Sequence, residues 1–133
     1  MKKIFILLLI LLQIQLIAQD SLRISAELNK AKTTYLTKLD SSIIYARNVV
    51  QWSDQIADDW QKAWGLKMVG VYHQMRREID SAMYYFGESL VLFENESDTL
   101  EIGKSNLSLG QMNIQRGFFD IASRLWRGGT SLY

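Results

Sequence analysis

A short signature that recurs every forty residues constrains the fold of this 133-residue chain more than any other feature. In each copy a large apolar residue precedes an aspartate, and a small residue follows that aspartate two places later. The three copies are Leu39-Asp40 with Ser42, Ile79-Asp80 with Ala82, and Phe119-Asp120 with Ala122. The same shift relates Gly70 to Gly110 and Asp58 to Asp98. A fixed period in this range indicates a repeat architecture, so we divide the chain into repeats at about 20–57, 58–97 and 98–133.

Apolar side chains within each repeat recur at helical spacing, which predicts two helices per repeat. We expect helices over about 20–35 and 40–56 in the first repeat, 58–75 and 80–93 in the second, and 98–115 and 119 onward in the third. Gly117 is placed to end a helix in the left-handed conformation, which glycine adopts at little cost.

Two helix starts carry the same capping pattern. Asp58 is followed three places later by Gln61, and Asp98 by Glu101. In a capping box the first side chain accepts a hydrogen bond from a first-turn N–H, and the second reaches back to the cap residue. We expect both pairs to do so.

Small residues fall where the helices of a pair should cross. The predicted packing residues are Gly70, Ala82 and Phe86 in the second repeat, and Gly110, Ala122 and Trp126 in the third. Glycine and alanine let two helices approach, and the aromatic side chain fills the neighbouring gap. A helical hairpin cannot bury its apolar face alone, so stacked hairpins share one core. The predicted fold class is therefore all-α, with three antiparallel helix pairs.

The first eighteen residues differ in kind from the rest. Lys2 and Lys3 precede an apolar run over Ile4 to Leu12, and this run is shorter than the twenty or so residues that span a membrane. The pattern is typical of a signal peptide over 1–18 cleaved near Ala18, which leaves a domain over 19–133 with no membrane span in the periplasm or outside the cell. The alternative is an uncleaved N-terminus that anchors the chain. Without cysteine, the domain must be held together by packing alone.

Composition argues against a nucleic-acid partner. The chain is 48% hydrophobic and 22% charged, which is typical of one small folded domain. Residues 19–133 contain thirteen basic and fourteen acidic side chains, so their net charge is −1. Binding to a phosphate backbone needs a clustered excess of lysine and arginine, and this segment has none.

The sequence offers no convincing catalytic or metal site. His73 is the only histidine, which excludes histidine-dependent triads and multi-histidine metal centres. We interpret it as structural, and we interpret Asp58-Asp59 as a helix cap. We therefore expect no catalytic residue, no metal and no cofactor, and we predict that the chain is not an enzyme. An enzyme would need a site built with one histidine and no cysteine.

These features resemble the tetratricopeptide repeat. That family places a Leu-Gly pair in the first helix, an alanine twelve residues after the glycine, and an aromatic residue four places further on. The matching residues are Val69-Gly70, Ala82 and Phe86 in the second repeat, and Leu109-Gly110, Ala122 and Trp126 in the third; Gly117 and Phe119 match the turn. The first repeat departs, with Lys30, Ser42 and Ala46 at these places. The resemblance implies a right-handed α-solenoid, similar to the exported sensor-type repeat segments of Bacteroidetes bacteria.

The resemblance also implies a binding groove on the inner face of each first helix. The corresponding residues are Trp64, Lys67, Val71, Gln74, Met75, Lys104, Leu107, Gln111 and Ile114. Each of these positions is also compatible with ordinary surface. Some family members clamp a C-terminal carboxylate with a lysine and an asparagine four places later, but Lys67 is followed there by Val71, so this mode is not supported.

We therefore expect an exported, non-catalytic scaffold that binds a protein or peptide. The last repeat leaves an outer apolar face without a cap, which offers a surface for a homodimer. The alternative function is a sensory input segment of a repeat-containing histidine kinase or transcriptional regulator.

Overall fold

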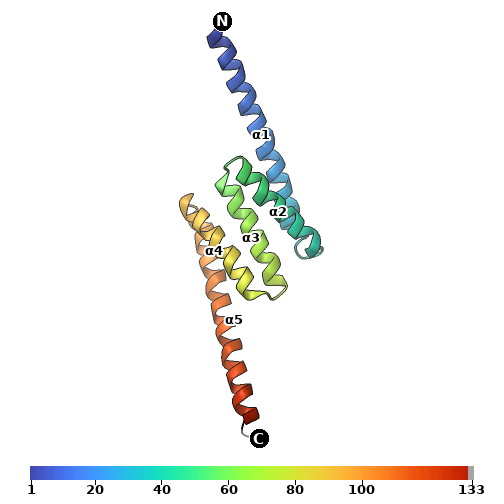
Figure 1. The fold of residues 1–133 in the computed structure, drawn as a ribbon, viewed down its shortest axis with the longest axis vertical. Coiled ribbons are helices and arrows are strands. Elements are labelled where there is room, and N and C mark those ends of the chain that lie inside the picture. Colours follow the sequence, from blue (N-terminus) through green and yellow to red (C-terminus); the bar gives the residue numbers. More distant parts are fainter. Residues whose placement is uncertain (132–133) are drawn as a thin grey trace.

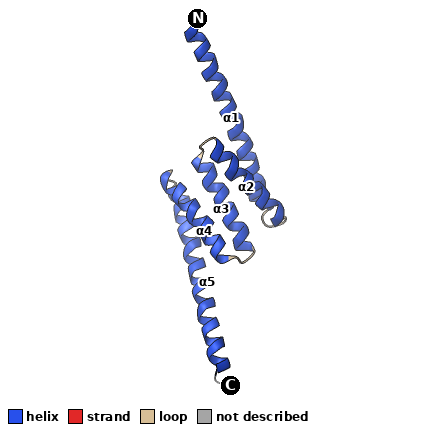
Figure 2. Ribbon diagram, viewed as in Figure 1, coloured by secondary structure: helices blue, strands red, loops and turns tan. Residues whose placement is uncertain are grey.

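The chain is all-helical. The computed structural model describes residues 1–131, with side chains described as far as Arg127. Within these residues there are five helices and no strand: α1 (Lys2–Thr34), α2 (Leu39–Gln55), α3 (Asp59–Met75), α4 (Ile79–Asn95) and α5 (Thr99–Ser131). Figure 2 shows the short loops that join them. The predicted all-α class is confirmed.

The three middle helices are equivalent units. Each of α2, α3 and α4 has 17 residues, and each is followed by a turn with one residue in the left-handed conformation. These residues are Ala57 (φ 54°), Arg77 (φ 61°) and Ser97 (φ 55°). At each turn, the backbone N–H of the residue after the left-handed one donates to a carbonyl in the last turn of the helix. Asp58 N, for example, donates to Ser53 O at 2.9 Å. The forty-residue repeat thus consists of two twenty-residue helix units.

Consecutive helices pack side by side, so α2, α3 and α4 form a compact body with the adjoining halves of α1 and α5 (Figure 1). The first core cluster joins α1, α2 and α3 around residues such as Leu28, Val49 and Val69. The second joins α4 and α5 around Ala82, Phe86 and Met112. Burial of these side chains supplies the main driving force for packing.

Small residues lie at the crossings of the middle helices. A Cβ atom added at Gly70 would lie 3.1 Å from the Phe86 ring, so glycine is what lets that ring seat against α3. Next to it, Ser89 Oγ donates a 2.8 Å hydrogen bond to Ala63 O. Gly65 contacts α2 in the same way, at Val49 and Val50.

The predicted break at Gly117 is wrong. α5 runs without interruption from Thr99 to Ser131, and no described glycine has a positive φ. The left-handed turn residues at 57, 77 and 97 predict one more at 117. A missing cap does not explain its absence, because α2 and α4 begin after Lys38 and Glu78 without a side-chain cap bond. The third repeat is one long helix instead of a hairpin.

The predicted packing role of three residues in the third repeat also fails within the single chain. A hairpin would bring Ala122 and Trp126 against Gly110, but all three lie on one helix and are exposed. Trp126 is 75% exposed, and a Cβ added at Gly110 would meet nothing within 4 Å. The C-terminal half of α5 instead extends beyond the body (Figure 1).

The N-terminal segment is helical and extends from the opposite end of the body (Figure 1). α1 continues through Ala18 without a break, and every residue from 1 to 20 is exposed. In the described part of the chain, α1 alone is long and apolar enough to cross a membrane, a test that signal sequences also pass. This apolar N-terminal helix is compatible with either a signal peptide or an anchor.

Candidate interaction cluster

A lysine–tryptophan cluster joins the helices α1, α3 and α5. Lys32 Nζ of α1 lies 3.7 Å from the centroid of a Trp64 ring on α3, and Lys67 Nζ lies 4.6 Å from it. An ammonium within about 6 Å of an aromatic face is attracted by the ring quadrupole. Trp64 therefore holds two cations at the junction of two repeats.

The cluster continues to α5 through a carboxylate. Lys67 Nζ donates to Glu101 Oε2 at 2.5 Å, and Lys104 Nζ donates to Glu101 Oε1 at 3.3 Å. Only 5% of the Glu101 side chain and 14% of the Lys67 side chain are exposed. Burial makes an unpaired charge costly, so this pair should fix the position of α5 against α3.

The capping residues explain how these side chains reach the cluster. Asp58 Oδ1 accepts from Gln61 N at 3.0 Å, and Asp98 Oδ1 accepts from Glu101 N at 3.2 Å, so the first half of each capping box is confirmed. The backbone N–H of each cap aspartate already donates into the preceding turn, so neither second side chain bonds to that N–H. Gln61 does reach back to Asp58, donating to its Oδ2 at 3.1 Å, and it also donates to Ser21 Oγ of α1 at 3.0 Å. Glu101 does not reach back but accepts from Lys67 of α3. Both side chains link one repeat to the previous one.

Aromatic residues hold Trp64 in place. It makes edge-to-face contacts with Trp60, at a centroid distance of 6.2 Å, and with Phe93 of α4, at 5.8 Å. Its Nε1 is buried and has no hydrogen-bond partner among the described residues. Such contacts orient an aromatic ring beyond what simple burial would do, so they hold the Trp64 ring in place within the cluster.

The electrostatic balance of the cluster is positive. Burial lowers the pKa of Lys32; the nearby carboxylate of Glu101 opposes this effect, and the ammonium groups of Lys67 and Lys104 reinforce it. Three ammonium groups stand against one carboxylate, which leaves an excess of two positive charges. Among the described residues, no carboxylate lies within ion-pairing distance of Lys32.

The structure brings together only part of the groove set predicted from sequence. Trp64, Lys67 and Lys104 meet in this cluster, whereas Val71 packs against both core clusters. Met75 is 47% exposed at the end of α3, and Leu107, Gln111 and Ile114 are exposed along α5. The sequence did not predict Lys32 as a site residue, because the residue forty places later is not a lysine. It assigned Glu101 only a capping role.

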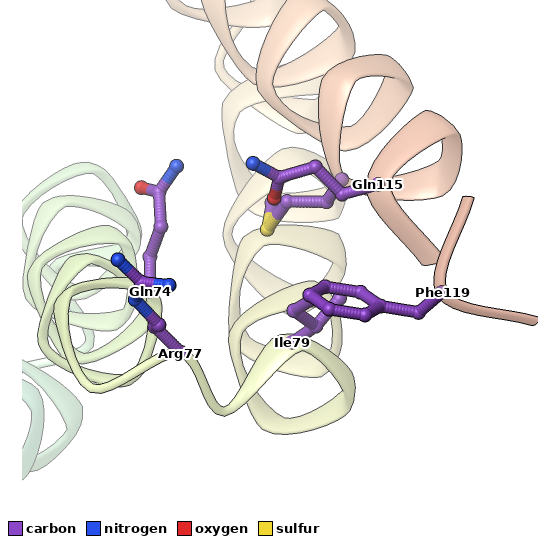
Figure 3. Close-up of a pocket in the computed structure, with 6 residues that line it drawn as sticks. Gln74, Arg77, Ile79, Gln115 and Phe119 are labelled. Carbon is purple, nitrogen blue, oxygen red and sulfur yellow. The ribbon is translucent and has the colours of Figure 1, made fainter. Parts of the chain in front are cut away.

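Gln74 belongs to a separate pocket of about 270 Å³. Figure 3 shows Gln74 and Arg77 on one side of it, and Ile79, Gln115 and Phe119 on the other, with Met112 completing the lining. This volume is slightly below the usual range for sites that bind small molecules. The pocket is therefore weaker evidence for a binding site than the charged cluster.

His73 lies in a structural contact between α3 and α4. Its ring stacks on Tyr85 at a centroid distance of 5.3 Å, and its Nδ1 lies 2.9 Å from Glu78 Oε2. Glu78 also accepts from Arg76 Nε at 2.5 Å. These hydrogen bonds, first from Arg76 and then from His73, lower the pKa of Glu78. Within the described residues, no group of three histidine, aspartate or glutamate side chains is arranged to hold a metal.

Comparisons with family models, with curated proteins and with solved structures found no match for this chain, so its membership of the tetratricopeptide repeat family stays a prediction.

Proposed function

We propose that this protein is an exported, non-catalytic scaffold of the tetratricopeptide repeat type, and that its lysine–tryptophan cluster binds an acidic segment of a partner protein. The observation that carries the proposal is the excess of positive charge beside a fixed indole. A partner carboxylate would pair with Lys32, and an apolar partner side chain would pack on the aromatic residues around Trp64. Concave surfaces of stacked helix pairs commonly bind extended segments of other proteins.

The burial of Lys32 supports this assignment. Burial disfavours the charged form of Lys32 and lowers its pKa, because the nearby Glu101 carboxylate forms no ion pair with it and only partly opposes the effect. An incoming carboxylate would remove that penalty, and it would do so in a region where part of the water has already been displaced. The neighbouring pair between Lys67 and Glu101 is already satisfied, which leaves Lys32 as the cation best placed to accept a ligand.

The binding test uses a labelled peptide rich in aspartate and glutamate, measured by fluorescence anisotropy with the full-length protein. Lys32→Gln should weaken binding about tenfold, because a hydrogen bond to a charged group contributes about 1.5 to 3 kcal/mol. Lys62→Gln is the matched control, since Lys62 pairs with Asp54 of α2 outside the cluster. Equal affinity of both variants for the peptide would contradict binding at the lysine–tryptophan cluster.

A second candidate function, a sensory input segment, is favoured by the continuity of α5. A helix that leaves the body without a break can carry a movement of the body to a domain beyond it. Hydrogen exchange along α5 with and without the acidic peptide would test this role. A change in protection confined to residues 99–115 would argue against transmission along the helix.

A further inference from the structure

An apolar seam runs along the face of α5 that is turned away from α4. Its residues are Leu107, Gln111, Ile114, Phe118, Ile121 and Leu125, which alternate in steps of four and three residues. This spacing repeats every seven residues and keeps all six on one side of the helix, as in the a and d positions of a coiled coil. Five of the six are large apolar residues.

The seam is uncovered in the single chain. The exposed fractions of its apolar residues lie between 54% for Ile121 and 71% for Leu125. The opposite side of α5 is already used, because Met112 is buried in the second core cluster and Leu109 packs against it. α5 is thus apolar on two faces, and only one of them has a partner among the described residues.

The residues that flank the seam favour another helix as that partner. They are Ser108, Gly110, Gln115, Gly117, Ala122 and Arg124. Three of the six are glycine or alanine, so a second helix can approach closely, and Arg124 is the one charged member. Charged residues at these flanking positions set partner choice in coiled coils. Because only Arg124 is charged, two copies of the seam can face each other with little like-charge repulsion.

We infer that the seam pairs two copies of this chain as a parallel, two-stranded coiled coil. The polar residue Gln111 determines the orientation. In a parallel pair it faces Gln111 of the second copy, so the two amides can bond to each other. In an antiparallel pair it would face the apolar Ile121 and stay unsatisfied. The pairing has twofold symmetry, in which both copies present the same surface.

This inference goes beyond the proposed function and does not depend on it. The seam contains neither Lys32 nor Trp64, so loss of peptide binding and loss of pairing can be told apart. The pairing also gives Gly110 and Ala122 a role beside an interface between copies, in place of the hairpin that the sequence predicted. It would present two lysine–tryptophan clusters in one particle.

Disulfide cross-linking tests the pairing directly, because the chain has no cysteine of its own. The full-length protein is used in a mild detergent, so that residues 1–18 do not aggregate. Gln111→Cys places the thiol in the seam, where equivalent residues of a parallel pair are close enough for a disulfide. Ser123→Cys is the control, since Ser123 is exposed on α5 but lies off the seam. Mild oxidation should convert most of the Gln111→Cys protein to a covalent dimer and little of the Ser123→Cys protein.

A second substitution tests the seam without disturbing the body. Adding Ile121→Glu to the Gln111→Cys protein should reduce the dimer yield at least fivefold, while circular dichroism and affinity for the acidic peptide stay unchanged. Persistent cross-linking in the double variant would overturn the proposal, because association would then occur elsewhere, for example through the N-terminal helix. Orientation is tested with Ile114→Cys and Phe118→Cys chains, which keep Gln111 and which an antiparallel pair would place opposite each other. Cross-linking only between unlike chains in a mixture of these two would overturn the parallel orientation. A monomer in both single-cysteine variants would overturn the pairing altogether.

Discussion

At Gly65 the backbone of α3 lies directly against α2. A Cβ atom there would lie 2.9 Å from Val49 Cγ1 and 3.0 Å from Val50 N. Gly65→Ala should therefore destabilise the fold by about 1 to 3 kcal/mol, as overpacking does, although alanine is the better helix former. Gly87→Ala is the matched control, because a Cβ at Gly87 meets nothing within 4 Å, and it should stabilise by up to about 1 kcal/mol. Urea unfolding measures the stability of both variants. A gain in stability in both would contradict the close approach of α3 to α2 at Gly65.

Ala57 carries a turn in a conformation that favours glycine. Its φ of 54° places its Cβ close to the backbone, at a cost of about 1 to 2 kcal/mol in an L residue. Ala57→Gly should remove that cost, and after the larger unfolded-state entropy of glycine is subtracted, it should stabilise by about 0.5 to 1 kcal/mol. The same substitution at Ala26, an exposed position inside α1, should destabilise by about 1 kcal/mol. Thermal unfolding measures both variants. Tm shifts of the same sign in both would rule out a conformational cost at Ala57.

The start of α4 makes stability depend on pH in the acid range. Glu78 has a folded-state pKa below its ordinary value of 4.5, because Arg76 and then His73 hydrogen-bond to its carboxylate. A lowered folded pKa means that the contribution is complete above the unfolded pKa and is lost as pH falls through the folded one. Glu78→Gln should therefore lower stability at pH 7, and the difference from wild type should shrink below about pH 4.5. Glu88→Gln, at a carboxylate on the same helix, is the control. A stability difference between Glu78→Gln and wild type that does not vary with pH would exclude a contribution from the ionised Glu78 carboxylate.

Local patterns predict α2, α3 and α4 well because each has its own apolar stripe, and α3 also has a capping residue, Asp58. Gly70 and Phe86 meet within one hairpin, so their spacing in the sequence already reflects their contact. α5 was mispredicted because Gly117 permits a turn but does not require one. Lys32 and Glu101 join the cluster only through the stacking of α1, α3 and α5. No spacing within a repeat encodes that contact, whereas Trp64 and Lys67 could be placed by periodicity.

For the whole molecule, the packed body and the N-terminal apolar segment should be separable. Residues 1–20 are all exposed, and the first side chain of α1 that bonds to the body is Ser21, through Gln61. Removing residues 1–18 should therefore change the free energy of unfolding by less than about 0.5 kcal/mol, as for exposed positions without partners. Removing residues 1–25 also deletes Ile24, which is 1% exposed, and should cost about 2 to 5 kcal/mol.

Urea unfolding monitored by tryptophan fluorescence compares the two truncations with the full chain. The 19–133 protein keeps both the lysine–tryptophan cluster and the seam of α5. It should therefore bind the acidic peptide with unchanged affinity and, without detergent, give the same Gln111→Cys dimer. A large loss of stability on removing residues 1–18 would show that the apolar segment packs on the body. Loss of the dimer alone would show that the copies associate through that segment.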